Sequence, residues 1–359
     1  MRLKLYKIIV KNTEKVLKKS FENSYFKTNN GPYNDPETKV RAYSHWAITL
    51  LKAYEITKEN KYKNAAKTFL DYLCSKEARP FGFTFYCRKN PKKDKCNGLI
   101  GQAWTIEALM QGYKVLKEEK YKKLARKVFL MHNFKKSCGY WKRREITGKK
   151  LFYDMTFNHQ LWFAAIGSMI SNDKNDRVGK QVNIFMDKLE KNISIHKNGL
   201  IRHLIFAKLI SPLYLLKNKL VKSKIDKLYL YNKEAGYHAF NLYALALLKE
   251  RFPNHKLWQS KKFKKILEYA ISKEHFVVSE KDKYGFPFNP SGIETAFFVY
   301  VFKEYFKGYK KIMKERLEKQ FKNHLDKETF LMDKNTSDPN TLSARIYEAV
   351  HLPNLKLEF

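Results

Sequence analysis

Apolar residues recur along this chain in helical runs that repeat at a fixed interval. The runs WAITLLKAY, WTIEALMQGY and WFAAIGSMI begin at Trp46, Trp104 and Trp162, a spacing of 58 residues in both steps. The first two runs are followed by Lys-rich amphipathic stretches, KENKYKNAAKTFLDYL and KEEKYKKLARKVFLMH. A long period built from two helices predicts stacked helical hairpins.

The pattern continues in weaker form to the end of the chain. Similar apolar runs surround Tyr243 and Phe298, and a last one begins at Thr341. Six runs of the first kind then have only five amphipathic partners after them. The Lys-rich amphipathic stretch over residues 1–20 supplies the sixth, so we expect this N-terminal helix to close the outer ring.

The two kinds of helix differ in polarity. The first is apolar nearly all round, which predicts burial on every side, whereas the second has one apolar face and suits an outer layer. The predicted fold is therefore all-α: an (α/α)6 double toroid of six helical hairpins, with residues 1–359 as a single domain. The alternative is an open superhelix of the tetratricopeptide kind, but its units are shorter, at about 34 residues.

The composition agrees with a helical enzyme or binding protein. Hydrophobic residues make up 44% of the chain, while Gly (14) and Pro (10) are scarce, which excludes a disordered chain and disfavours a β-sandwich. No run is long enough to span a bilayer, and the N-terminus lacks the apolar region of a signal peptide. The four cysteines form no CxxC pair and have no His in metal-ligand spacing, so we expect no metal, no cofactor and a cytoplasmic location.

The net charge of +37 favours an anionic partner, unless it reflects compositional bias alone. An inserted segment at about 203–230 alternates apolar clusters with lysines. It is either a covering helix or a basic amphipathic segment lying on an anionic membrane. We favour the second interpretation, which places the protein at the inner face of the membrane. No nucleic-acid-binding motif is present, so no nucleic-acid partner is expected.

Polar residues collect near the start of each predicted inner helix. Because parallel inner helices begin at one face of a ring, these side chains should share a pocket, where helix dipoles favour anions. For the Asp and Asn residues, simple helix capping is the alternative. His45, His159 and His238 fall at equivalent places in three repeats, which predicts that they line the pocket together.

Three segments carry a resemblance to a known family: NGPYNDPETKVRAYSHW (30–46), NGLIGQAWTIEAL (97–109) and FNHQLWFAA (157–165). They resemble the six-hairpin glycosidase-like proteins with an (α/α)6 toroid, closest to members encoded in polysaccharide-biosynthesis clusters. That class includes glycoside hydrolases, unsaturated glucuronyl hydrolases, polysaccharide lyases and sugar epimerases, so the resemblance implies carbohydrate chemistry without fixing the reaction.

The resemblance and the polar positions together give a set of candidate residues. The predicted catalytic residues are Asp154, His159, Glu234, Tyr237, His238 and Glu294. The predicted substrate-binding residues are Asp35, Arg41, His45, Asn97, Gln102, Trp104, Asn158, Asn241 and Arg345. Asp154, and to a lesser extent Asp35, stand where unsaturated glucuronyl hydrolases place a catalytic Asp, but without the flanking motif.

The predicted function is cleavage, by hydrolysis or elimination, of an acidic and uronate-containing surface polysaccharide or its lipid-linked precursor. Hydrolysis needs two carboxylates across one bond, whereas elimination needs a proton acceptor and a cation beside the uronate carboxylate. The alternatives are a uronate or sugar epimerase of the same fold and a non-catalytic helical module that binds an anionic, membrane-associated partner.

Overall fold

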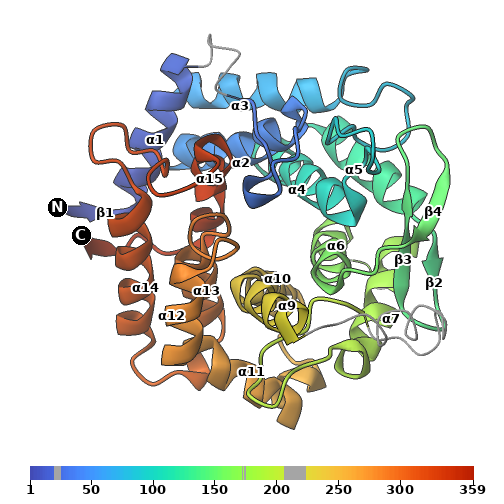
Figure 1. The fold of residues 1–359 in the computed structure, drawn as a ribbon. Helices are drawn as coiled ribbons and strands as arrows, with labels where there is room; N and C mark the ends of the chain where they lie inside the picture. The colour runs from blue at the N-terminus through green and yellow to red at the C-terminus, as the bar shows by residue number, and fades with distance from the viewer. Residues whose placement is uncertain (20–25, 172, 174, 206–223) are drawn as a thin grey trace.

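The structure is a computed structural model that describes residues 1–19, 26–171, 173, 175–205 and 224–359. An inner ring of helices forms its centre (Figure 1). Successive inner helices pack against one another, and the last contacts both α13 and α2, which closes the ring. The members are α2 (Lys39–Thr57), α4 (Gly98–Leu116), α6 (Phe157–Ile170), α10 (His238–Arg251), α13 (Ser291–Val301), and α15 (Pro339–Ala344) continued by the 3-10 helix η4 (Arg345–His351).

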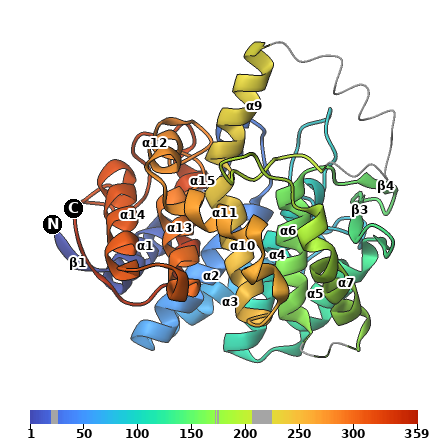
Figure 2. The same ribbon diagram turned by 90° about the horizontal axis from the view of Figure 1, so that it is seen from below.

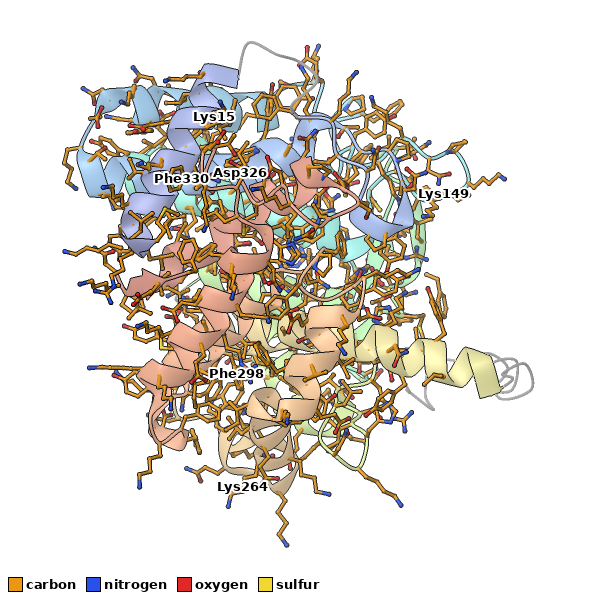
Figure 3. All side chains as sticks on the ribbon, turned by 60° about the vertical axis from the view of Figure 1, so that its left-hand side comes forward. Lys15, Lys149, Lys264, Phe298, Asp326 and Phe330 are labelled. Atoms are coloured by element: carbon orange, nitrogen blue, oxygen red, sulfur yellow. The ribbon has the colours of Figure 1, made fainter. Side chains whose placement is uncertain are left out.

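A second layer of helices surrounds this ring (Figure 1). These helices are amphipathic. In α3 (Asn60–Leu73), Tyr62, Ala66 and Phe69 are buried on one face while the lysines face solvent. The exposed Lys149 and Lys264 and the buried Phe298 illustrate the same division between surface and interior (Figure 3). The outer helices are α1 (Leu5–Lys19), α3 (Asn60–Leu73), α5 (Glu119–Met131), α7 (Arg177–Asn192), α11 (Lys261–Ile271) and α14 (Tyr309–His324).

The N-terminal helix takes the predicted place in the outer ring. In α1, Asn12 Nδ2 donates to the carbonyl of Phe330, ahead of α15, at 2.7 Å. Strand β1 (Arg2–Lys4) pairs antiparallel with β5 (Lys356–Glu358), and Arg2 forms an ion pair with Glu358 at 3.0 Å. The predicted double toroid of hairpins is therefore confirmed, with the two ends of the chain joined by a short two-stranded sheet.

The repeating tryptophans occupy corresponding positions in α2, α4 and α6. Trp46 and Trp162 are buried in the core, and Trp162 Nε1 donates to the carbonyl of Phe240 on α10 at 3.0 Å. Trp104 is 5% exposed and, unlike the other two, forms part of a cavity wall. One position of the repeat thus serves both the packing of the ring and the candidate site.

Some elements were not expected from the hydrophobic pattern. A three-stranded sheet of β2 (Phe134–Lys135), β3 (Tyr140–Arg144) and β4 (Lys150–Tyr153) lies between α5 and α6. Gln160 Nε2 on α6 donates to the carbonyls of Trp141 and Asp154, at 2.8 and 3.0 Å, which fixes this sheet to the start of α6. The remaining short helices are η1 (Gly31–Tyr33), η2 (Lys256–Gln259), α12 (Lys273–Lys281) and η3 (Lys303–Tyr305).

The predicted insertion is only partly described. Residues 206–223 lie outside the described residues, so the membrane contact predicted there stays a prediction. The described remainder includes α9 (Lys224–Gly236), which projects from one end of the barrel next to α10 (Figure 2). None of the described helices is both long enough and apolar enough to cross a membrane.

Candidate active site

A cavity of about 210 Å³ opens where the inner helices begin. Asn97, Thr156 and Tyr237 are the N-cap residues of α4, α6 and α10, and Asn289 lies just ahead of α13. All four line the cavity, so the expected convergence of helix N-termini on one polar pocket is present. The remaining lining residues are Asn30, Tyr33, Arg88, Lys93, Ile100, Trp104, His159, His203, Lys233, Phe240, Phe288 and Arg345.

His159 and Asp154 form a hydrogen-bonded pair at the cavity wall. His159 Nδ1 lies 2.8 Å from Asp154 Oδ2, and the backbone N–H of Leu99 donates to the same oxygen at 2.9 Å. Burial by itself would raise the pKa of Asp154, but His159, the Leu99 N–H and Arg143 together lower it to about 2. An ionised carboxylate only accepts hydrogen bonds, so Nδ1 of His159 donates to Asp154, and Nε2 is the ring nitrogen outside this hydrogen bond.

A second histidine, His203, also lines the cavity. Its backbone N–H donates to Glu234 Oε1 at 2.9 Å, and its ring lies 5.3 Å from that of Tyr237, measured between centroids. Within the described part of the chain, Nδ1 of its ring has no hydrogen-bond partner. Burial, followed by Lys233 and His159, lowers the pKa of His203 well below its usual value, so the ring is neutral near pH 7.

Arg345 presents a buried guanidinium to the cavity. Its NH2 group lies 2.7 Å from Glu294 Oε1 and 2.6 Å from Glu348 Oε1, and NH1 donates to Asn289. Burial and the neighbouring Glu348 carboxylate raise the pKa of Glu294 well above its usual value, despite the opposing effect of Arg345. Glu294 therefore holds Arg345 in place and does not itself line the cavity.

The structure places several predicted residues on the cavity or directly behind it. Asn97, Trp104, His159, Tyr237 and Arg345 line it. Asp35 lies 3.1 Å from Lys93 and 3.5 Å from Arg88, both of which are lining residues. The guanidinium of Arg41 lies 4.2 Å from the ring centroid of Trp104 and donates to Asn30.

Other predicted residues lie apart from the cavity. Gln102 bonds to the backbone of Phe85 and Cys96, which gives it a structural role. Glu234 lies 2.7 Å from His196, and its other oxygen accepts the backbone N–H of His203. Three more are buried within the ring without lining the cavity: His45, Asn158 and Asn241.

The predicted grouping of three histidines does not occur. His45 stacks on Tyr347 inside the ring, with ring centroids 4.3 Å apart, and His238 packs outward against Tyr269 and His275. Neighbouring residues on a helix point about 100° apart, so a chain that turns Tyr237 into the cavity turns His238 away from it. Only His159 of the three reaches the cavity.

Several lining residues were not among the predicted ones. Asn30 and Tyr33 lie in the first of the three motifs, ahead of the helix that begins at Lys39, and no hydrophobic period marks them. Arg88, Lys93 and Lys233 have no sequence signal that separates them from the other basic residues of a Lys-rich chain. His203 lies within the insertion that was interpreted as a membrane segment; its proximity to His159 depends on a backbone bridge between Thr156 and Leu204.

Comparison with known proteins bears on both fold and family. No family model matches the chain. A D-mannose isomerase structure superposes with a TM-score of 0.64 at 14% identity, covering 96% of this chain and 97% of that one. An unsaturated glucuronyl hydrolase specific for heparin gives 0.59 at 12% identity, with 96% of each chain covered. These likenesses show the (α/α)6 fold of carbohydrate-active enzymes.

One relative is much nearer in sequence. Archaeal glycosylation protein Q of Haloferax volcanii is 40% identical over 342 residues, which cover 91% of each chain. Identity at that level, over nearly the full length of both proteins, shows membership of one family and not only a common fold. The chain belongs to the family of archaeal glycosylation protein Q.

Proposed function

We propose that this protein is an enzyme of glycan assembly that moves a proton on a sugar residue held in the cavity, as an epimerase or isomerase does. The observation that carries the proposal is the pairing of His159 with the ionised Asp154 at the wall of a small polar cavity. The relation to a glycosylation protein supports a role in building a glycan.

The proposed chemistry begins with the hydrogen on a carbon next to a carbonyl or carboxylate group of the sugar. His159 Nε2 accepts this proton, and the Asp154 carboxylate stabilises the positive charge that the ring acquires. Negative charge then develops on the sugar oxygen, where a buried cation such as Arg345 stabilises it. His203 is the second group able to exchange a proton with the bound sugar, because it lines the cavity and its Nδ1 has no hydrogen-bond partner among the described residues.

Hydrolysis, one of the two cleavage reactions that the sequence predicts, has less support from the geometry. Hydrolysis requires two carboxylates on either side of the bond. Among the described residues that line the cavity, none is Asp or Glu. The three carboxylates predicted to be catalytic already hold other groups. Asp154 holds His159, Glu234 holds His196 and the backbone of His203, and Glu294 holds Arg345.

Elimination is the second candidate reaction. It begins with the same proton abstraction by His159 and requires a cation next to the carboxylate of a uronate. Arg88, Lys93 and Lys233 on the cavity wall favour such an acidic sugar. A lipid-linked precursor and contact with an anionic membrane remain part of the proposal, supported by the net charge of +37.

Exchange in heavy water tests this function. The full chain is incubated in D₂O with D-mannose, D-glucose, D-glucuronate or D-galacturonate, and separately with uronate oligosaccharides. Each sugar is followed by NMR and mass spectrometry. The expected result is deuterium on a ring carbon with no new reducing ends. An unsaturated, ultraviolet-absorbing product from uronate oligosaccharides would indicate elimination instead, and new reducing ends without that product would show hydrolysis and contradict the proposal.

Two variants separate the site from the rest of the protein. His159→Gln should reduce the exchange rate by about a hundredfold or more, the usual contribution of a general base. His255→Asn is the matched control, because His255 caps η2 through the N–H of Leu257, contacts Asp187 and Trp258, and lies outside the cavity lining. Equal rates in the two variants would remove His159 from the mechanism.

A further inference from the structure

Lys233 is a half-buried cation without an anionic partner. It lies in the last turn of α9, and its Nζ is 5.2 Å from the ring centroid of Tyr33, 5.5 Å from Tyr284 and 6.0 Å from Tyr237. In the described part of the chain its ammonium group makes no ion pair and no hydrogen bond, although its backbone carbonyl accepts from the N–H of Tyr237. Aromatic faces attract an ammonium group, but they do not accept its three N–H hydrogens as a carboxylate does.

The surroundings of Lys233 contain more positive than negative charge. Lys93 and Arg88 share the carboxylate of Asp35, and Arg88 and Arg143 share that of Asp94. Lys283 contacts the ring of Tyr284 and, like Lys233, has no ion pair among the described residues. Of the three basic residues near this wall that line the cavity, Arg88 and Lys93 are paired with Asp35, whereas Lys233 has no carboxylate partner among the described residues. Burial together with Lys283 and Lys93 lowers the pKa of Lys233.

A tyrosine pair adds a hydrogen-bond donor to the same wall. The hydroxyl oxygens of Tyr33 and Tyr237 lie 2.9 Å apart, and both residues line the cavity. Only one hydroxyl hydrogen is used between them, so the other is available to a ligand. Burial raises the pKa of both phenols, which keeps them protonated and able to donate.

We infer that this wall is an oxyanion-binding subsite, centred on Lys233 with Tyr33 and Lys93, that holds a carboxylate or phosphate group of the sugar substrate. The inference rests on the proposed function, since it names the class of sugar that the cavity takes. An oxyanion supplies the counterion that Lys233 has nowhere among the described residues, and it accepts hydrogen bonds from the ammonium and phenol groups. The subsite thereby places the charged group of the sugar within the same cavity as His159.

Equilibrium binding to the full chain tests the subsite independently of turnover. The probes are D-glucuronate, D-glucose 1-phosphate and the neutral D-glucose, titrated by calorimetry at low salt. At least one charged probe should bind about tenfold or more tightly than glucose, because hydrogen bonds to charged groups typically contribute that much. A preference for glucuronate assigns the subsite to a carboxylate, and a preference for glucose 1-phosphate assigns it to a phosphate.

Two variants that each remove one positive charge, Lys233→Met and Lys264→Met, test whether Lys233 causes the preference for a charged probe. Lys233→Met should abolish the preference for the charged probe, whereas Lys233→Arg should keep most of it. Lys264→Met is the control, because Lys264 is exposed on α11 at the outside of the barrel (Figure 3). The inference is overturned if glucose binds as well as the charged probes, if Lys233→Met keeps the preference, or if no probe binds at its solubility limit.

The outcomes also distinguish this inference from the proposed function. Deuterium exchange on neutral sugars, with no preference for an anion, would overturn the subsite and leave the proposed function standing. Binding of a charged probe that depends on Lys233, without exchange on any charged or neutral sugar, would keep the subsite and contradict the proposed reaction.

Discussion

Gly98 lies directly against the carboxylate of Asp154. Gly98 begins α4 with a φ of +61°, and a Cβ at this position would come within 2.5 Å of Asp154 Oδ2 and 3.1 Å of His159 Nδ1. Its own N–H donates to Asp94 Oδ1 at 2.8 Å. The absence of a side chain at the start of α4 therefore lets the backbone approach the Asp154–His159 pair and lets Leu99 donate to it.

Gly98→Ala should therefore abolish most of the exchange activity while the protein stays folded. The left-handed backbone costs an alanine about 1–2 kcal/mol, and the added methyl group must also displace the Asp154 carboxylate. Gly82→Ala is a close control, because Gly82 has a φ of +71° but no atom within 4 Å of the added Cβ. Thermal unfolding should show the cost of a left-handed alanine in both variants and a larger loss of stability in Gly98→Ala. The exchange assay should show that activity is lost only in Gly98→Ala.

Asp154→Asn should inactivate the enzyme while leaving the cavity formed. We expect a rate loss of about a hundredfold or more, similar to that of His159→Gln. The double variant should be little worse than either single one; losses that multiply would show that the two residues do not act as one unit.

The sequence predicted the ring well because burial leaves a periodic trace. Trp46, Trp104 and Trp162 mark equivalent turns of three inner helices, and a spacing of 58 residues is the length of one hairpin with its loops. The convergence of helix N-termini followed from the same repeat. Asn97, His159, Tyr237 and Arg345 were found in this way, since each lies near the start of an inner helix.

Orientation around a helix and contacts outside the repeat were harder to predict. His238 shares the repeat position of the other histidines, but a single step along the chain points it at α11 and α12 instead of the cavity. His203 and Lys233 lie between α7 and α10, where the spacing of the apolar runs departs from 58 residues. Their place in the cavity depends on backbone pairing next to Thr156 and on the position of α9, neither of which leaves a hydrophobic period.

Stability should fall as the pH is lowered from 7 to 4. Burial lowers the pKa of both His132 and His275 to about 4, below the ordinary value of 6.5. Between these two pH values the unfolded chain binds protons that the folded chain does not, so each buried ring costs stability as the pH falls, by at most about 3 kcal/mol. Denaturant unfolding at several pH values measures the slope.

The matching variants are His132→Asn and His275→Asn. Each amide can still donate to the carbonyl that the histidine contacts, Lys142 in the first case and Ala270 in the second. Each variant should therefore flatten the dependence of the unfolding free energy on pH between 4 and 6.5. A slope unchanged in both variants would mean that other groups cause the loss at low pH.

Arg345 should prove more important to stability than its single side chain suggests. Its guanidinium is 1% exposed and lies within 2.7 Å of both Glu294 and Glu348, which are fully buried. Removing one partner of a buried ion pair commonly costs about 3–5 kcal/mol, because the remaining charge has neither water nor a counterion. Arg345→Met should therefore lower the unfolding free energy by about that amount, and adding Glu294→Gln to it should recover part of the loss. If the double variant is no more stable than Arg345→Met alone, the cost does not come from the unpaired Glu294 carboxyl group. It then comes from the unpaired Glu348 or from the lost contacts of Arg345 with Phe240 and Phe288.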